Sequence, residues 1–229
     1  MHIRRIVNHE TNCYLLPGDG GTVLIDPGPA SGASRVVAAV KEAGIQPDAV
    51  RLILVTHGHL DHYGAAEEVK AWCGAPVGAY HSEPAFSQER RNALPPAQTL
   101  RGSIVRWFYL LLSPLARFSP LKADLLLDDG ADLAPFGLEA EVLLTPGHSP
   151  GSLSIHTAAG DIFVGDLFVN YVVPSQPLYL SDMEAWQRSY ERVQELRPRM
   201  LYVGHGEPFP GTDLDDLYPA RYQFRWWVR

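Results

Sequence analysis

Four side chains that can bind a metal ion lie within six consecutive residues, His57-Gly58-His59-Leu60-Asp61-His62. The apolar residues 52–55, typical of a buried strand, come just before this segment. His57 and His59 are two residues apart, so both can face one ion, while Asp61 and His62 begin a predicted helix and can turn toward a second. Zinc and similar ions bind imidazole nitrogen and carboxylate oxygen readily. The cluster therefore predicts a metal site where a strand ends.

Three more candidate ligands each follow an apolar stretch and a glycine. His148 comes after Gly147, Asp166 after Gly165 and His205 after Gly204. A glycine there permits a tight turn and a close approach of the backbone to an ion. The ligands are expected to meet beyond the carboxyl ends of strands, where α/β sheets place their sites. Five histidines and two aspartates suffice for two metal ions.

The other histidines lack this context. A lone histidine after a strand is usually solvated or packed, and a lone Gly-Asp is usually a turn, but neither explanation accounts for the six-residue cluster. His2, His9, His81 and His156 are therefore not expected to bind metal, although His81 could line the site.

Length and charge limit the class of protein. The chain has 229 residues, which suits a single domain over residues 1–229, and its net charge is −7. An acidic chain is a poor candidate for binding a nucleic-acid backbone. Two cysteines exclude a disulfide-rich scaffold and a zinc module built on cysteines. No secretion signal or apolar stretch of about 20 residues is present, so we expect a cytoplasmic protein without stable membrane insertion.

Strands and helices alternate along the chain, which indicates an α/β protein. Strands are predicted at residues 11–16, 22–26, 51–56, 77–80, 124–128, 138–145, 152–157, 161–164 and 200–203. Helices are predicted at residues 33–43, 61–72, 103–112, 182–196 and 213–229. Residues 81–123, rich in proline and arginine, interrupt the pattern and are interpreted as an insertion.

With these residues in place, the sequence resembles the metallo-β-lactamase superfamily. The matching positions are Asp26 in Leu24-Ile25-Asp26-Pro27-Gly28, the His57–His62 cluster, His148 in Thr145-Pro146-Gly147-His148-Ser149, Asp166 and His205. The resemblance implies an αββα four-layer sandwich with two mixed β-sheets and the site at one edge.

The resemblance also implies roles for these residues. His57, His59 and His148 would hold a first metal ion, and Asp61, His62 and His205 a second, with Asp166 bridging them. The cofactor would be two divalent ions, zinc first, with iron or manganese as alternatives. Asp61 would also pass a proton to the leaving group, which makes Asp61 and Asp166 the catalytic candidates. Asp26 would orient the site from a buried position, or would be a plain turn carboxylate before Pro27.

The complete His/Asp set narrows the function. Zinc β-lactamases of this family commonly have Cys at the position of Asp166 or lack a ligand of the cluster, whereas this set is similar to that of the glyoxalase II and lactonase branches. We expect a hydrolase in which a bridging hydroxide attacks a small acyl ester, thioester or lactone. Two alternatives stay open, a mononuclear iron sulfur dioxygenase of the same fold and a non-catalytic metal-binding protein.

Substrate contacts and assembly are less constrained. The insertion is either an apolar lid carrying Trp107 and Phe108 or a structural element. Tyr171 could assist an oxyanion or simply pack. Trp226 and Trp227 pack within the chain or in a homodimer interface. Ser149 fits the Gly-x-Ser-x-Gly pattern of serine hydrolases, but that elbow requires a helix next, and residues 152–156 alternate like a strand.

Overall fold

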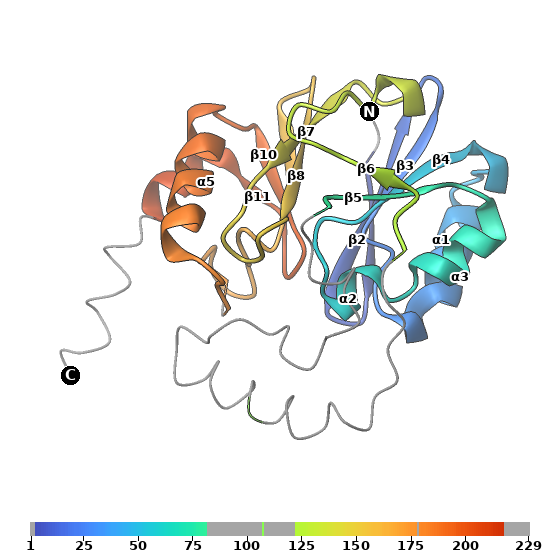
Figure 1. Cartoon of the computed structure of the whole chain (residues 1–229), viewed down its shortest axis with the longest axis horizontal. Coiled ribbons are helices and arrows are strands. Elements are labelled where there is room, and N and C mark those ends of the chain that lie inside the picture. Colours follow the sequence, from blue (N-terminus) through green and yellow to red (C-terminus); the bar gives the residue numbers. More distant parts are fainter. Residues whose placement is uncertain (1–2, 82–106, 108–121, 178, 218–229) are drawn as a thin grey trace.

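The computed structural model describes residues 3–81, 107, 122–177 and 179–217. Two β-sheets face each other, with helices on the outer side of each (Figure 1). This arrangement confirms the αββα sandwich of two mixed sheets that the resemblance implies. In the described part of the chain, no helix combines the length and the hydropathy needed to cross a membrane.

The first sheet has six strands in the order β1-β2-β3-β4-β5-β6. Their bounds are β1 Arg4–Asn8, β2 Thr11–Gly18, β3 Gly21–Ile25, β4 Val50–Leu54, β5 Val77–Ala79 and β6 Leu125–Leu126. The first three strands are antiparallel and the others run parallel to β3. A tight turn at Asp19-Gly20 joins β2 to β3 as a hairpin.

The second sheet has five strands in the order β11-β10-β9-β8-β7. Their bounds are β7 Ala140–Leu144, β8 Leu153–Thr157, β9 Asp161–Gly165, β10 Met200–Val203 and β11 Phe209–Pro210. β9 and β10 are parallel, so their carboxyl ends meet at the same edge of the sheet.

Alternation along the strands explains why the sheets stack. In β2, Tyr14 and Leu16 belong to the core between the two sheets, whereas Cys13 and Leu15 belong to the core beneath the first layer of helices. In β9, Phe163 faces the middle core and Ile162 the outer core of the second sheet. Since successive side chains of a strand point to opposite faces, strands that are apolar on both faces need a cover on each side.

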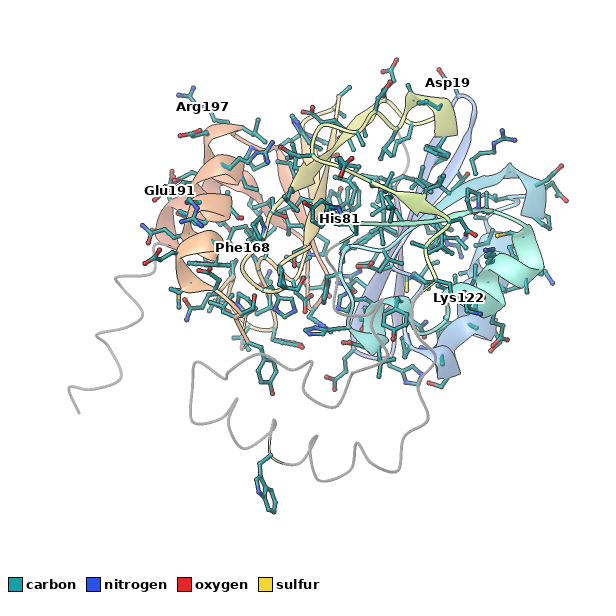
Figure 2. The ribbon with its side chains drawn as sticks, viewed as in Figure 1. Asp19, His81, Lys122, Phe168, Glu191 and Arg197 are labelled. Carbon is teal, nitrogen blue, oxygen red and sulfur yellow. The ribbon has the colours of Figure 1, made fainter. Side chains whose placement is uncertain are left out.

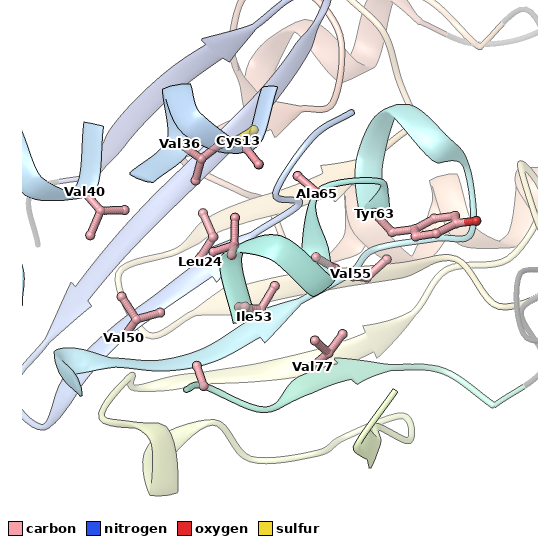
Figure 3. Packing of buried hydrophobic residues seen from close by; sticks show 14 of the residues in the cluster. Cys13, Leu24, Val36, Val40, Val50, Ile53, Val55, Tyr63, Ala65 and Val77 are labelled. Carbon is pink, nitrogen blue, oxygen red and sulfur yellow. The ribbon is translucent and has the colours of Figure 1, made fainter. Parts of the chain in front are cut away.

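Two helices, α1 Ala33–Glu42 and α3 Ala66–Cys73, cover the outer face of the first sheet. Figure 3 shows Val36 and Val40 of α1 opposite Leu24 and Ile53 of the sheet, and all four side chains are fully buried.

Helix α5, Met183–Glu195, covers the second sheet from the other side. Its buried Trp186 and Tyr190 pack with Phe168, which Figure 2 shows beside the helix, while Glu191 lies on its exposed side and exposed Arg197 follows its last turn. Asp182 caps the helix, because its side chain accepts a hydrogen bond from the backbone N–H of Ala185.

The predicted helix at residues 61–72 is wrong in one respect, since the chain forms two helices there. These are α2, Leu60–Tyr63, and α3. The backbone N–H of Ala65 donates to the carbonyl of Gly28 rather than to a carbonyl one turn earlier, which redirects the chain. Gly64 permits this close approach, because a Cβ there would lie 2.7 Å from the backbone nitrogen of Ala30.

Strands β1 and β11 were not predicted from the sequence, since β1 contains two apolar residues among five and β11 is only two residues long. The predicted strand at 124–128 is shorter. Of the predicted helix at 213–229, residues 213–216 belong to a 3₁₀ helix, Gly211–Asp216, and residues 218–229 lie outside the described residues. Within the insertion, only residues 81, 107, 122 and 123 are described, and Figure 2 labels two of them, His81 and Lys122. The predicted helix at 103–112 lies outside the described residues, with the exception of Trp107. Phe108, Trp226 and Trp227 also lie outside them.

Candidate metal centre

All seven predicted ligand residues come together where the strands end. The ligand atoms of each group lie within 4.8 Å of one another, and the two groups are His57, His59, His148 and Asp166, and Asp61, His62 and His205. Asp166, expected between the two groups, meets this distance limit with the first group and also lies 3.4 Å from His62 and 3.4 Å from His205 of the second.

The ends of four strands supply these residues. The cluster at 57–62 follows β4 and includes the first residues of α2, while His148, Asp166 and His205 follow β7, β9 and β10. Gly204 shows why glycine precedes a ligand. A Cβ at Gly204 would lie 2.3 Å from Asp166 Oδ1 and 2.6 Å from His62 Cε1, so a larger residue would displace two members of the site.

The ring nitrogens of the first group converge. His59 Nδ1 lies 3.0 Å from His57 Nε2 and 3.0 Å from His148 Nε2. In the second group, His62 Nε2 lies 3.3 Å from His205 Nε2. Four histidines thus present Nε2 to the site, and His59 presents Nδ1.

Two of these rings are held by backbone carbonyls. His148 Nδ1 lies 2.8 Å from the carbonyl oxygen of Tyr179, and His205 Nδ1 lies 2.7 Å from that of Glu10. A carbonyl can only accept, so each Nδ1 carries a proton and donates it. Such a partner fixes the orientation of a ligand histidine.

Asp166 lies between the two groups. Its Oδ2 is 3.4 Å from His205 Nε2 and 3.6 Å from His148 Nε2, and its Oδ1 is 3.4 Å from His62 Nε2. The residue is only 7% exposed, and Oδ1 has no hydrogen-bond partner among the described residues. A buried carboxylate oxygen without a donor is costly unless a cation balances it, so this position fits a metal ion.

Asp61 is the site carboxylate that reaches solvent. Its side chain is 48% exposed, and its Oδ2 lies 3.3 Å from His205 Nε2. The hydroxyl of Thr11 donates to the same oxygen at 3.4 Å. Asp61 can therefore contact both the second group and a molecule that approaches from solvent.

Burial keeps the first group of histidines neutral. It lowers the pKa of His57 well below its usual range and the pKa of His59 to about 3, and neighbouring histidines lower both further. Burial also lowers the pKa of His148. Neutral imidazole is the form that binds metal ions.

Carboxylates dominate the electrostatics of the second group. Burial alone would lower the pKa of His62, but Asp166 and Asp61 outweigh it and raise the pKa to about 10. The pKa of His205 is likewise raised well above its usual range, against the effect of burial. Burial would raise the pKa of Asp166, yet His205 and His62 hold it well below its usual range. This end of the site strongly favours positive charge.

Asp26 contacts the cluster directly, as the orienting role requires. His62 Nδ1 lies 2.9 Å from Asp26 Oδ2, and the backbone N–H of Thr56 donates to Oδ1 at 2.8 Å. A plain turn carboxylate would make neither contact. The hydroxyl of Thr56 lies between Asp26 and His57. This residue was not predicted from the sequence, where its position just before the cluster was the only sign of a role in the site.

The remaining candidates lie as follows. His9, His81 and His156 belong to neither group and lie beside Ser31, Asp128 and Glu141 respectively. His2 lies outside the described residues.

Tyr171 stands over the second group, its ring stacked on that of His205 with 6.0 Å between centroids. The serine elbow is not formed, because the strand β8 follows the turn that carries Ser149.

Comparisons with known proteins agree with this geometry. The probable metallo-hydrolase YqgX of Bacillus subtilis is 30% identical over 210 residues, 90% of this chain and 88% of the relative. The hydroxyacylglutathione hydrolase GloC of Haemophilus influenzae is 28% identical over 166 residues, 69% and 66% of the two chains. The crystal structure of BLEG-1 B3 metallo-beta-lactamase has a TM-score of 0.71 at 25% identity and covers 96% of this chain and 99% of that one.

The family model described as the metallo-beta-lactamase superfamily matches residues 7–205, a span that contains all seven residues of the site. This chain therefore belongs to the metallo-beta-lactamase superfamily.

Proposed function

We propose that the chain is a metal-dependent hydrolase that holds two divalent ions and cleaves a small acyl ester, thioester or lactone. The observation that carries this proposal is the convergence of five ring nitrogens and two carboxylates, with Asp166 in contact with histidines of both groups. Zinc is the first candidate, with iron and manganese as alternatives, because this mixed nitrogen and oxygen donor set suits all three.

His57, His59 and His148 would hold the first ion and Asp61, His62 and His205 the second. The field that raises the pKa of His62 and His205 also favours a divalent cation, whose binding displaces their protons. Asp166 would join the two groups from its buried position between them. Bound divalent ions in such a site supply a hydroxide at neutral pH and polarise the substrate carbonyl.

The chain's own side chains would order the reaction around these ions. Asp166 is buried and held by both groups, so it would keep their spacing constant while a substrate enters. Asp61 is half-exposed and in contact with His205, so its carboxylate would take up a proton on the solvent side and pass it to the leaving group. No nucleophilic serine is needed, which agrees with the turn and strand around Ser149.

Acyl compounds are favoured as substrates for two reasons. The seven-residue His/Asp set is similar to that of the glyoxalase II and lactonase branches, and GloC, which shares 28% identity, is named a hydroxyacylglutathione hydrolase. BLEG-1, in contrast, is named a β-lactamase, so a β-lactam belongs in the test.

The test is hydrolysis of a panel by metal-loaded protein, comprising thioesters, lactones, simple esters, a phosphodiester and a β-lactam. We expect turnover of an acyl ester, thioester or lactone that a strong chelator abolishes and added zinc restores. His57→Ala should be inactive, whereas Ser149→Ala should keep most activity. Activity that survives the chelator and is lost in Ser149→Ala would contradict the proposal, and oxygen consumption with a sulfur substrate would favour a dioxygenase.

A further inference from the structure

We infer that Thr56 is a positioning residue. Asp26 orients a histidine of the first metal group through the hydroxyl of Thr56, and it orients a histidine of the second group directly. The inference rests on the proposed metal site and adds to it a residue that neither the cluster nor the resemblance assigns. Its basis is a chain of short contacts among side chains that are all nearly fully buried.

Counting donors and acceptors determines where the protons lie. Thr56 Oγ1 is 2.7 Å from Asp26 Oδ2 and 3.0 Å from His57 Nδ1. A carboxylate only accepts, so the single hydroxyl proton of Thr56 goes to Asp26. The hydroxyl oxygen must then accept a proton from His57 Nδ1. His57 therefore carries its proton on Nδ1, and the lone pair of Nε2 faces the first group.

The same carboxylate reaches the second group without a relay. Asp26 Oδ2, which accepts from Thr56, also lies 2.9 Å from His62 Nδ1. The proton of that contact must come from His62, so its Nε2 faces the second group. One aspartate thus sets the orientation of His57 and His62, one ring in each group.

The surroundings of Thr56 leave it little freedom. It is 1% exposed, its backbone N–H donates to Asp26, and its carbonyl accepts from the backbone N–H of Leu153 in the second sheet. A Cβ added to Gly165, the residue before Asp166, would lie 2.7 Å from Thr56 Oγ1. The threonine is therefore packed between the turn that carries the cluster and the turn that carries Asp166.

Removal of the hydroxyl alone should disturb His57 selectively. In Thr56→Val the shape is nearly kept, but His57 Nδ1 loses its acceptor, and the ring can move its proton to Nε2, which lies 3.0 Å from His59 Nδ1. That form cannot bind a metal ion through Nε2. Loss of such an orienting partner typically weakens metal affinity about 10- to 100-fold.

Two further variants distinguish the effect of losing the Thr56 hydroxyl from the effect of altered packing. Thr56→Ser keeps the hydroxyl and loses the methyl group, so it should bind zinc within about 3-fold of the wild type, well short of the loss of an orienting partner. Thr157→Val removes another buried hydroxyl, whose hydrogen bonds among the described residues are to the backbone of Asp161, at the far end of β8. It should lower stability without changing zinc affinity.

Asp26→Asn tests whether the single carboxylate of Asp26 orients both rings. Asparagine tolerates the positive φ of 49° at this position, but its amide offers one accepting oxygen in place of two. Because Asp26 serves both rings, this variant should weaken zinc binding by both groups.

The experiment is a zinc titration against a chromophoric chelator, made in His205→Ala and His59→Ala backgrounds so that each measures mainly one group. Thr56→Val should weaken binding by the first group, measured in the His205→Ala background, about 10- to 100-fold, and change the second much less. Unchanged binding in Thr56→Val, or an equal loss in Thr56→Ser, would overturn the inference.

Imidazole nitrogen NMR of the metal-free protein provides a readout that needs no metal. The wild type should show the His57 proton on Nδ1, and Thr56→Val should move it toward Nε2. If the wild type binds no zinc, the proposed function fails while this spectrum still judges the role of Thr56. A wild-type spectrum with the proton on Nε2 would refute that role by itself.

Discussion

Each ligand histidine has one ring nitrogen that faces the site and one that faces away from it. The hydrogen-bond partner of the outer nitrogen determines which of the two nitrogens faces the site. Side chains supply the outer partner of His57 and His62, whereas backbone carbonyls of Tyr179 and Glu10 supply it for His148 and His205. A carbonyl belongs to every residue type, so no sequence pattern could have revealed these two contacts. Among these four histidines of the described chain, side-chain substitutions can therefore remove the outer partner of His57 and His62 but not that of His148 and His205.

Asp166 should be indispensable for activity but not for folding. Asp166→Ala removes the carboxylate that contacts histidines of both groups, so turnover should fall by orders of magnitude while circular dichroism stays native. Asp48→Ala, at an exposed position in the 3₁₀ helix Pro47–Ala49, is the control and should change neither. Near-normal turnover in Asp166→Ala would remove this residue from the site.

Tyr171 should act through its ring. The ring is stacked on that of His205 and is 56% exposed, and partial burial together with nearby carboxylates raises the pKa of its hydroxyl. Tyr171→Phe should therefore keep kcat within about 3-fold, whereas loss of an oxyanion donor costs about 100- to 1,000-fold. A loss of that larger size in steady-state kinetics would assign the hydroxyl to the oxyanion.

At the scale of elements, Gly204, which directly follows β10, shows how closely the ligand-bearing turns pack. Gly204→Ala removes no ligand, but its Cβ would displace Asp166 and His62, so zinc affinity should fall by about 10-fold or more. Gly44→Ala is the contrast. Gly44 has a φ of 73° and nothing within 4 Å of an added Cβ, so its substitution should cost stability and leave zinc affinity unchanged.

Helix α5 supports two ligand-bearing turns. Trp186 Nε1 donates to the carbonyl of Leu167 beside Asp166, and a Cβ at Gly147 would lie 2.4 Å from Trp186 Cα. Trp186→Phe loses the hydrogen bond and leaves a void, so the free energy of unfolding should fall by about 2–4 kcal/mol in urea. Arg188→Ala, at an exposed neighbour, should change it by less than about 0.5 kcal/mol. A similar small change in Trp186→Phe would contradict this role.

Periodicity predicted the elements whose faces are apolar and missed those held by other contacts. β4 and β9 each contain a continuous apolar run, α5 repeats apolar residues at helical spacing, and all three were predicted close to their observed bounds. The break between α2 and α3 depends on a hydrogen bond to the carbonyl of Gly28, 37 residues before Ala65 in the sequence, and β1 depends on pairing with β2. Such long-range contacts leave little trace in local composition.

At the scale of the whole molecule, the two sheets must be stacked before the site exists. His57 and His62 follow a strand of the first sheet, and His148, Asp166 and His205 follow strands of the second. That these seven residues come together could be predicted from the sequence, because each of the four segments that carry them follows an apolar strand. The contacts through Thr56, Glu10 and Tyr179 could not, because they depend on how the sheets and turns meet.

The central claim is that this stacked arrangement binds two metal ions per chain, and elemental analysis of protein purified without chelator tests it most directly. We expect about two divalent transition-metal ions per chain, zinc foremost, and recovery of both when chelator-stripped protein is exposed to zinc. Protein that contains no metal and binds none afterwards would contradict the account.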